Sequence, residues 1–296
     1  MKVIKTIREM QQISDFHNRE NKKIAVVPTM GYLHKGHLSL IEKANELADI
    51  VITTLFVNPT QFAPNEDFNK YPRDFDRDFE LAKSANSHYL FMPDTLEIYP
   101  KGHSTAVVVT NVTEKFEGVF RPSHFQGVAT IVAKLFNITK PQIAVFGQKD
   151  YQQTLVVKRL IEDLNFDIDL VIAPTLREHD GLAMSSRNSY LSPENRDKAG
   201  IIFRAIDEAK KVIAKGENDR KIINSTLHKI LREVPEIKID YASIALADTL
   251  EEPEFFFPGD KTVMLIACYL GKTRLIDNSL ITFPSRLNEA NFIEGL

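Results

Sequence analysis

The chain has 296 residues, of which 43% are hydrophobic and 26% are charged, and its formal net charge is −3 at pH 7. This composition is typical of a globular protein, and the length predicts two domains rather than one. Because acidic and basic residues nearly balance, the chain has no global basic field, and we expect no nucleic-acid partner.

The cysteine content and the apolar runs predict a cytoplasmic protein. The single cysteine, Cys268, cannot form an intramolecular disulfide, and it lies in an apolar run where we expect it to be buried. No apolar stretch reaches the length of a membrane span, and the amino terminus lacks the apolar core of a signal peptide. We therefore expect no membrane partner.

The segment 24–57 predicts a strand, a loop, a helix and a second strand. It begins with a short apolar run, continues with apolar residues at helical spacing from Leu38 to Ala48, and ends with the apolar run Ile50 to Val57. A parallel pair of strands joined by a crossover helix explains this order.

The loop of this unit carries two histidines, His34 and His37, at the predicted start of the helix. Gly36 between them allows the backbone to approach a bulky ligand closely. Such a loop lies at the carboxyl edge of a parallel sheet, where ligands bind, and the helix amino terminus favours phosphate. The pattern predicts an anion site, with two surface histidines as the alternative.

The same pattern of strands and helices continues to residue 173. A strand and a helix are also expected within residues 1–20, and a loop at 118–125. The further strands are expected at residues 88–91, 106–109, 143–146 and 169–173, and the further helices at residues 74–85, 126–136 and 151–164.

Polar residues follow two of these strands. Asn58 and Gln61 can face the same sheet edge as the histidine loop, although a polar turn explains them equally well. Lys149 can serve as a point charge on phosphate, whereas Asp150 can simply cap the next helix. One of the two glutamines in the first turn of that helix, Gln152 or Gln153, should face the cleft.

Beyond residue 192 the pattern changes, and the fold class we predict is α/β with a Rossmann-like parallel sheet domain followed by a smaller α+β lid domain. The domains are expected at residues 1–175 and 176–283, with a tail at 284–296. The second domain should contain helices at 193–215 and 219–233 and strands at 239–246, 263–268 and 272–276. The segment 177–188 suits a mobile phosphate-gripping loop that closes over the site, with an ordinary connector as the alternative.

His34-Lys35-Gly36-His37 is similar to the HIGH motif of the nucleotidyl-transferase superfamily, and the chain closely resembles one of its families, the pantoate–β-alanine ligases. The stretches that carry this resemblance are residues 28–40, 56–62, 71–73, 134–137, 146–153, 177–188 and 274–278. Three positions depart from the family pattern: Gln148, Ser123 and Glu117.

The resemblance implies an AMP-forming ligase and a homodimer. It implies that ATP, with Mg²⁺, drives the condensation of (R)-pantoate with β-alanine to pantothenate, AMP and diphosphate through a pantoyl-adenylate intermediate. Two other classes stay open: a small-molecule nucleotidylyltransferase of the same superfamily, and a non-catalytic nucleotide-binding or RNA-interaction module.

The resemblance also implies roles for individual residues. The residues implied to bind ATP are Met30, Gly31, Tyr32, Leu33, His34, Lys35, Gly36, His37, Gly147, Gln148, Lys149, Asp150, Leu176, Met184, Ser185, Ser186 and Arg187. The implied catalytic residues are His37, as proton donor, and His34, Lys149 and Arg187. The implied pantoate contacts are Gln61, Gln153 and Phe62, with Gln61 also holding β-alanine. No direct protein ligand of Mg²⁺ is assigned, and Asp150 is kept as a candidate.

Overall fold

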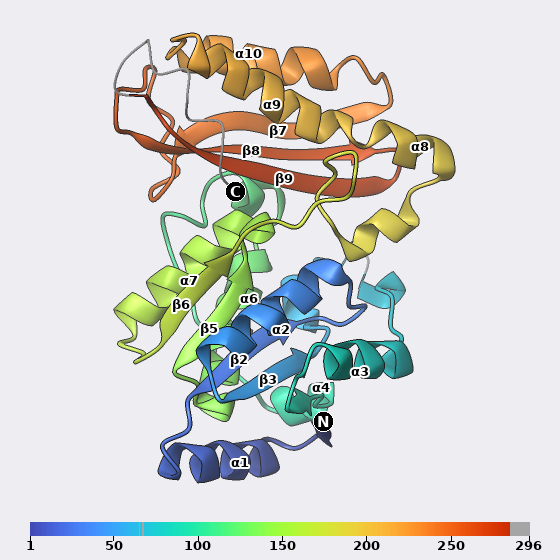
Figure 1. The fold of residues 1–296 in the computed structure, drawn as a ribbon, viewed down its shortest axis with the longest axis vertical. Helices are drawn as coiled ribbons and strands as arrows, with labels where there is room; N and C mark the ends of the chain where they lie inside the picture. Colours follow the sequence, from blue (N-terminus) through green and yellow to red (C-terminus); the bar gives the residue numbers. More distant parts are fainter. Residues whose placement is uncertain (65, 67, 285–296) are drawn as a thin grey trace. The chain divides into compact units, whose positions relative to one another are not determined.

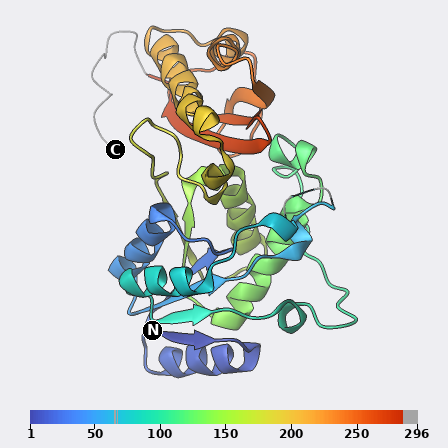
Figure 2. The same cartoon turned by 90° about the vertical axis from the view of Figure 1, so that its right-hand side faces the viewer.

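The computed structural model describes residues 1–64, 66 and 68–284. The chain divides into two compact units, Met1–Leu176 and Arg177–Leu296, each with its own sheet (Figures 1 and 2). Apart from Pro284, the predicted tail lies outside the described residues.

Unit 1 is built on a six-stranded sheet in the order β1-β4-β3-β2-β5-β6, in which every pairing is parallel. Its strands are β1 (Lys2–Ile4), β2 (Ile24–Thr29), β3 (Ile50–Leu55), β4 (Tyr89–Phe91), β5 (Ile143–Gly147) and β6 (Asp169–Ala173). Its α-helices are α1 (Ile7–Arg19), α2 (Lys35–Leu47), α3 (Phe75–Ser84), α4 (Thr95–Ile98), α5 (Glu117–Phe120), α6 (His124–Thr139) and α7 (Tyr151–Asp163). Three short 3₁₀ helices complete it: η1 (Pro59–Gln61), η2 (Phe68–Lys70) and η3 (Gln148–Asp150).

Side chains alternate between the two faces of this sheet. Along β2, Ala25 and Val27 join the core under α2 and α3, whereas Ile24 and Val26 join the core under α1, α6 and α7. Successive side chains of a strand point to opposite faces, so a strand covered on both faces becomes apolar throughout. Burial on both faces therefore explains the continuous apolar run.

The strand order reverses between β2 and β5. From β2 the chain proceeds to β3 and β4 on one side, whereas β5 and β6 lie on the other side. The register pairs Val26 with Ala144, so the two strands lie side by side and their carboxyl ends share one edge. Such a switch point is where open α/β sheets bind ligands.

Unit 2 has a three-stranded antiparallel sheet, β7-β8-β9, packed with two helices. Its strands are β7 (Ile237–Leu246), β8 (Lys261–Leu270) and β9 (Thr273–Thr282), and its helices are η4 (Ser186–Tyr190), α8 (Pro193–Lys198), α9 (Ile201–Ala214) and α10 (Arg220–Leu231). A parallel sheet with helices and a small antiparallel sheet confirm the predicted fold class.

Three predicted elements differ from the structure in their extent or conformation. The short strand at 272–276 is the ten-residue β9, and the helix at 193–215 is interrupted at Ala199 and Gly200. The loop at 118–125 is largely helical, because α5 extends into it as far as Phe120 and α6 begins at His124.

The predicted strand at residues 106–109 is wrong, since no strand is assigned there. The Val107 N–H donates to Thr130 Oγ1 on α6 at 2.9 Å, and Val107 packs on the core while Val108 is 64% exposed. The apolar run that suggested a strand thus belongs to a segment that lies against a helix and pairs with none of the described strands.

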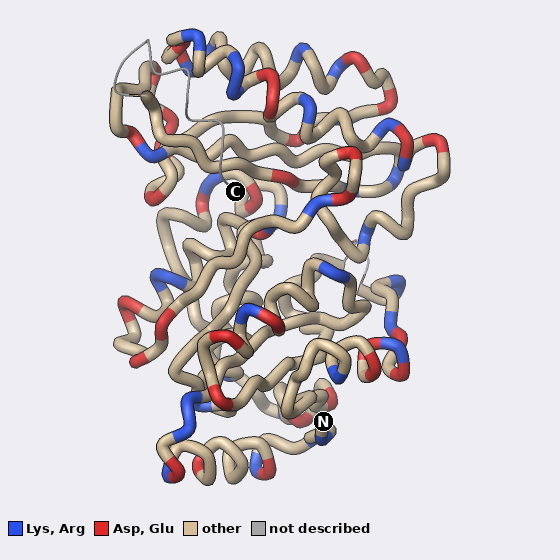
Figure 3. Tube along the Cα trace, in the orientation of Figure 1, with Lys and Arg blue, Asp and Glu red and all other residues tan. Residues whose placement is uncertain are grey.

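Basic and acidic residues are interspersed along the chain (Figure 3). Among the described helices, none combines the length and the apolar character needed to cross a bilayer. Within the same residues, no group of three or more His, Cys, Asp or Glu is placed to hold a metal ion.

Candidate functional site

The loop from β2 to α2 is held in shape by a residue far along the chain. Asp78 on α3 accepts hydrogen bonds from the backbone N–H groups of Tyr32 and Leu33, both at 2.7 Å. Gly31 has φ = 88°, a conformation that a glycine adopts without strain, and Tyr32 has φ = 50°. Burial raises the pKa of Asp78, although the two N–H donors oppose this effect. The sequence analysis missed Asp78, because an acidic residue in the first turn of a helix is ordinary.

His34 and His37 form a reciprocal cap at the start of α2. His34 Nδ1 accepts from the Gly36 N–H at 3.2 Å, and His37 Nδ1 accepts from the His34 N–H at 3.3 Å. The ring centroids are 4.0 Å apart. Since Nδ1 is an acceptor in both rings, each imidazole carries its proton on Nε2 when it is neutral. The cap therefore orients two N–H donors away from the helix backbone.

The environment favours the neutral form of His37. Its pKa lies well below the ordinary histidine value, chiefly because of burial and then because of the charges of His34 and Lys149. Part of its surface nevertheless stays accessible to solvent. A histidine that is neutral before an anion arrives acts as a hydrogen-bond donor, and a phosphate beside it would raise its pKa.

The residues after β5 bring a lysine to the same edge. Gly147 ends β5, and Gln148, Lys149 and Asp150 form η3. The Lys149 side chain is 19% exposed, its ammonium lies 3.9 Å from Asp150, and its charge acts on His37. Asp150 makes no capping hydrogen bond to α7, so the alternative role as a helix cap is not observed.

The segment after β3 places Gln61 beside the histidine loop. Gln61 is buried in η1, and its Nε2 donates to Met30 Sδ at 3.2 Å. Asn58 is buried as well and donates to Gln61 Oε1 at 3.1 Å. The Phe62 ring packs against aromatic neighbours, with its centroid 5.5 Å from that of Phe68.

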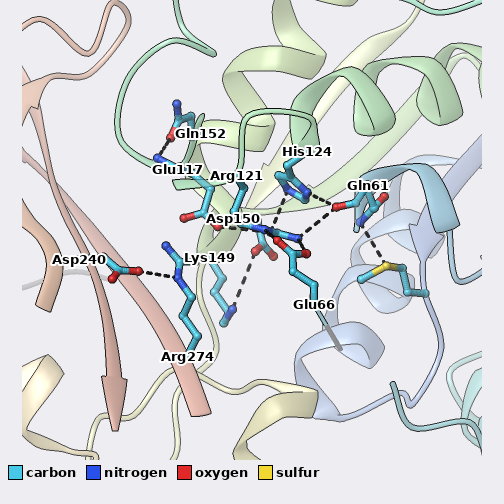
Figure 4. Close-up of polar contacts among 11 residues, drawn as sticks. Gln61, Glu66, Glu117, Arg121, His124, Lys149, Asp150, Gln152, Asp240 and Arg274 are labelled. Atoms are coloured by element: carbon cyan, nitrogen blue, oxygen red, sulfur yellow. Dashed lines mark hydrogen bonds and ion pairs between the residues drawn. The ribbon is translucent and has the colours of Figure 1, made fainter. Parts of the chain in front are cut away.

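A charged cluster holds the backbone of Gln61 (Figure 4). Arg121 donates to the Gln61 carbonyl oxygen at 3.2 Å and to both carboxylate oxygens of Glu66 at 2.7 and 2.8 Å. Glu117 lies 3.3 Å from the same guanidinium. His124 Nδ1 donates to the Gln61 carbonyl at 3.0 Å, and burial, with the charge of Arg121, lowers the pKa of His124 to about 4. The departure at Glu117 thus supplies a partner for Arg121.

The two glutamines of α7 have different surroundings. Gln152 is buried and donates to the carbonyl oxygens of Val112 and Lys115 while accepting from the Glu117 N–H. It therefore anchors the segment before α5, whereas Gln153 is half-buried and stays the prediction for the ligand contact.

The remaining predicted ATP contacts lie at the end of unit 1 and in unit 2. Leu176 is 40% exposed. In unit 2, Ser185 caps η4 by accepting from the Arg187 N–H at 3.2 Å, and Met184 precedes it. Asn188 donates to Glu178 and to the Ala183 carbonyl, which fixes this loop to its own unit.

The geometry of unit 1 defines the class of binding site. A parallel α/β sheet with oriented N–H donors and a lysine at its switch point is a Rossmann-like site for a phosphate-bearing ligand. A family model described as pantoate-beta-alanine ligase matches residues 2–280. The chain belongs to this family.

Individual relatives agree with this membership. The chain is 48% identical to a pantothenate synthetase of Thermoanaerobacter sp. (strain X514) over 95% of its length and 98% of the relative's, and 46% identical to that of Geobacter sulfurreducens over 95% and 99%. A crystal structure of the Thermus thermophilus pantothenate synthetase has a TM-score of 0.89 at 43% identity, covering 94% and 99% of the two chains. The Francisella tularensis pantoate-beta-alanine ligase, complexed with beta-gamma ATP and beta-alanine, has a TM-score of 0.77 at 32% identity, covering 95% and 97%.

Proposed function

We propose that this chain condenses (R)-pantoate with β-alanine, using ATP, and that pantoate is first activated as pantoyl adenylate. The observation that carries this proposal is the pair of Nε2–H donors on His34 and His37, beside Lys149, at the start of a helix at the switch point. The names of the relatives support the choice of substrates.

The first step joins two anions, since a carboxylate oxygen attacks the α-phosphorus while diphosphate leaves. The main requirement is therefore stabilisation of negative charge by donors that are already oriented. His34 and His37 would donate to phosphate oxygens, and Lys149 would act as a point charge. In this proposal residues 30–37 and 147–150 hold ATP. Leu176 and residues 184–187 are assigned to ATP by the family resemblance alone.

Pantoate would be held by neutral amides rather than by an arginine. Gln61 and Gln153 would contact its oxygens, and Phe62 would pack against its methyl groups. An arginine would bind the carboxylate more strongly before reaction, which stabilises the ground state and does not raise the rate. Gln61 would also contact β-alanine, whose amine attacks the acyl carbon of the adenylate and displaces AMP.

Mg²⁺ would enter with ATP and neutralise the leaving diphosphate. Among the described residues near Lys149, Asp150 offers a half-exposed carboxylate, whose oxygens are suitable ligands for Mg²⁺.

We further propose that the enzyme is a homodimer, which sedimentation velocity tests. We also propose that it is cytoplasmic, because ATP is its substrate.

The test is ATP–diphosphate exchange. We expect exchange with pantoate alone and none with β-alanine alone, because the adenylate forms before the amine is needed. Exchange that requires both substrates would overturn the two-step scheme. Release of AMP that depends on β-alanine separates this ligase from a nucleotidylyltransferase, which would need no amine.

A further inference from the structure

We propose that Tyr99 and Thr60 are positioning residues that determine, through Asn58, which end of the Gln61 amide faces the substrate acid. The inference rests on the proposed contact between Gln61 and pantoate. It concerns the direction of a hydrogen bond, because a glutamine can offer either N–H donors or a carbonyl acceptor.

The direction of the Asn58 amide follows from its neighbours. Asn58 is 1% exposed, and one atom of its amide lies 3.2 Å from the carbonyl oxygen of Gly127 on α6. A carbonyl oxygen can only accept, so the atom facing it is the amide nitrogen Nδ2. The opposite atom, Oδ1, receives hydrogen bonds from the hydroxyls of Tyr99 at 2.8 Å and Thr60 at 3.0 Å. The two hydroxyls lie 3.2 Å apart.

The orientation of the Asn58 amide also fixes the orientation of the Gln61 side-chain amide. The second N–H of Asn58 Nδ2 meets Gln61 at 3.1 Å, and only an acceptor fits there, which places Oε1 on that side. Gln61 Nε2 then points away from Asn58, toward Met30 Sδ at 3.2 Å. A thioether sulfur is a weak acceptor, so pantoate oxygens can replace it. Gln61 is thus fixed as a donor, which suits an acid whose oxygens accept.

The backbone around Gln61 leaves little freedom for another arrangement. A Cβ added at Gly127 would lie 2.5 Å from the Thr60 carbonyl oxygen and 2.6 Å from the Gln61 nitrogen, so α6 can approach η1 this closely only with a glycine. Arg121 and His124 both donate to the Gln61 carbonyl. The side-chain amide is therefore the part of Gln61 that Tyr99 and Thr60 control.

The experiment compares Tyr99→Phe, Thr60→Val and the double variant. Each single variant leaves one hydroxyl on Asn58 Oδ1, so we expect the pantoate KM in diphosphate exchange to rise less than about threefold. Without both hydroxyls the buried Asn58 Oδ1 loses both of its donors, and only the Gly127 carbonyl and Gln61 still hold the amide in its direction. We therefore expect a rise above about tenfold, more than the product of the single effects. The KM for ATP should stay within about twofold throughout, because removing a hydrogen bond to pantoate does not touch the phosphates.

The matched control is Tyr89→Phe, which removes a hydroxyl that lies 2.9 Å from His17 Nε2 in the same unit. It should leave both KM values unchanged. A folded double variant with wild-type pantoate KM, or with equal losses for pantoate and ATP, would overturn the inference. If the wild-type enzyme itself showed no pantoate-dependent exchange, the proposed function would fail instead.

Asn58→Asp provides an independent variant. The carboxylate that this substitution introduces only accepts when it is ionised, so Gln61 would turn its N–H groups inward and present Oε1 to the acid. We expect pantoate-dependent exchange to fall by more than about a hundredfold while ATP binding, measured by calorimetry, persists. Retention of near-normal exchange would contradict the assigned direction of the amide.

Discussion

Asp78 accepts a hydrogen bond from the backbone N–H of Leu33 at 2.7 Å across 45 residues of sequence. Its other carboxylate oxygen accepts from the Tyr32 N–H at the same distance. One carboxylate therefore satisfies two neighbouring donors in a loop that has two residues with positive φ. The brace connects the stability of unit 1 to the geometry of the proposed ATP site.

Asp78→Asn should weaken this brace, because an amide nitrogen cannot accept and one buried N–H would lose its partner. We expect a loss of about 1–3 kcal/mol in the free energy of unfolding and a higher KM for ATP. Urea unfolding and steady-state kinetics check this, with the exposed Asp76→Asn on the same helix as control. Equal behaviour of the two variants would show that the carboxylate does not shape the loop.

The histidine tautomers can be observed directly by ¹⁵N NMR of the free enzyme. We expect His34 and His37 to carry the proton on Nε2 and His124 to carry it on Nδ1. His124 should titrate near pH 4, and His37 well below the ordinary histidine pKa. Titration of His37 at or above its ordinary value would contradict the neutral donor.

The same shifts predict how stability depends on pH. Both histidines have a lower pKa in the folded than in the unfolded state, so the unfolded state binds more protons on acidification. Their contribution to stability is complete above the unfolded pKa of about 6.5 and is lost as the pH falls toward 4. Denaturant titrations at pH 7.5, 6 and 4.5 should give a decreasing free energy of unfolding, and His124→Asn should reduce this dependence.

His37 combines two functions that a pair of variants separates. In His37→Asn the Oδ1 atom can still accept from the His34 N–H, whereas the Nε2–H donor is lost. We expect adenylate formation to fall by about 10²–10³, as for loss of an oriented donor, with stability close to wild type. His37→Ala should show the same rate loss and, in addition, about 0.5–2 kcal/mol of destabilisation from the missing cap. A loss below threefold in either variant would show that His37 only supports the fold.

Cys268 should have no part in the chemistry. It is fully buried, and burial raises the pKa of its thiol to about 12. Cys268→Ala should cost roughly 1 kcal/mol of stability with little change in rate. A thiol reagent should react only when the protein unfolds, so rapid inactivation of the native enzyme that ATP prevents would rule out the buried core position.

Local features of the sequence determined the β2–α2–β3 unit and its histidine pair. Apolar runs, a 3.6-residue period and a helix-start motif all act between residues close in the chain, so their physical meaning is readable without a fold. The burial of Cys268 is equally local, since its neighbours in β8 are apolar. The family resemblance added the substrates and the ATP residues, which no period or spacing indicates.

Only the tertiary structure decided how the side chains of the site are oriented. The direction of the Gln61 amide depends on Gly127, whose carbonyl meets Asn58 across 69 residues, and the loop brace depends on Asp78. The apolar run at residues 106–109 suggested a strand, whereas in the structure Val107 packs on the core and Val108 is exposed because this segment lies against α6. The spacing of apolar residues in the sequence predicts which side chains are buried. The identity of a hydrogen-bond partner depends instead on which distant segments the fold brings into contact.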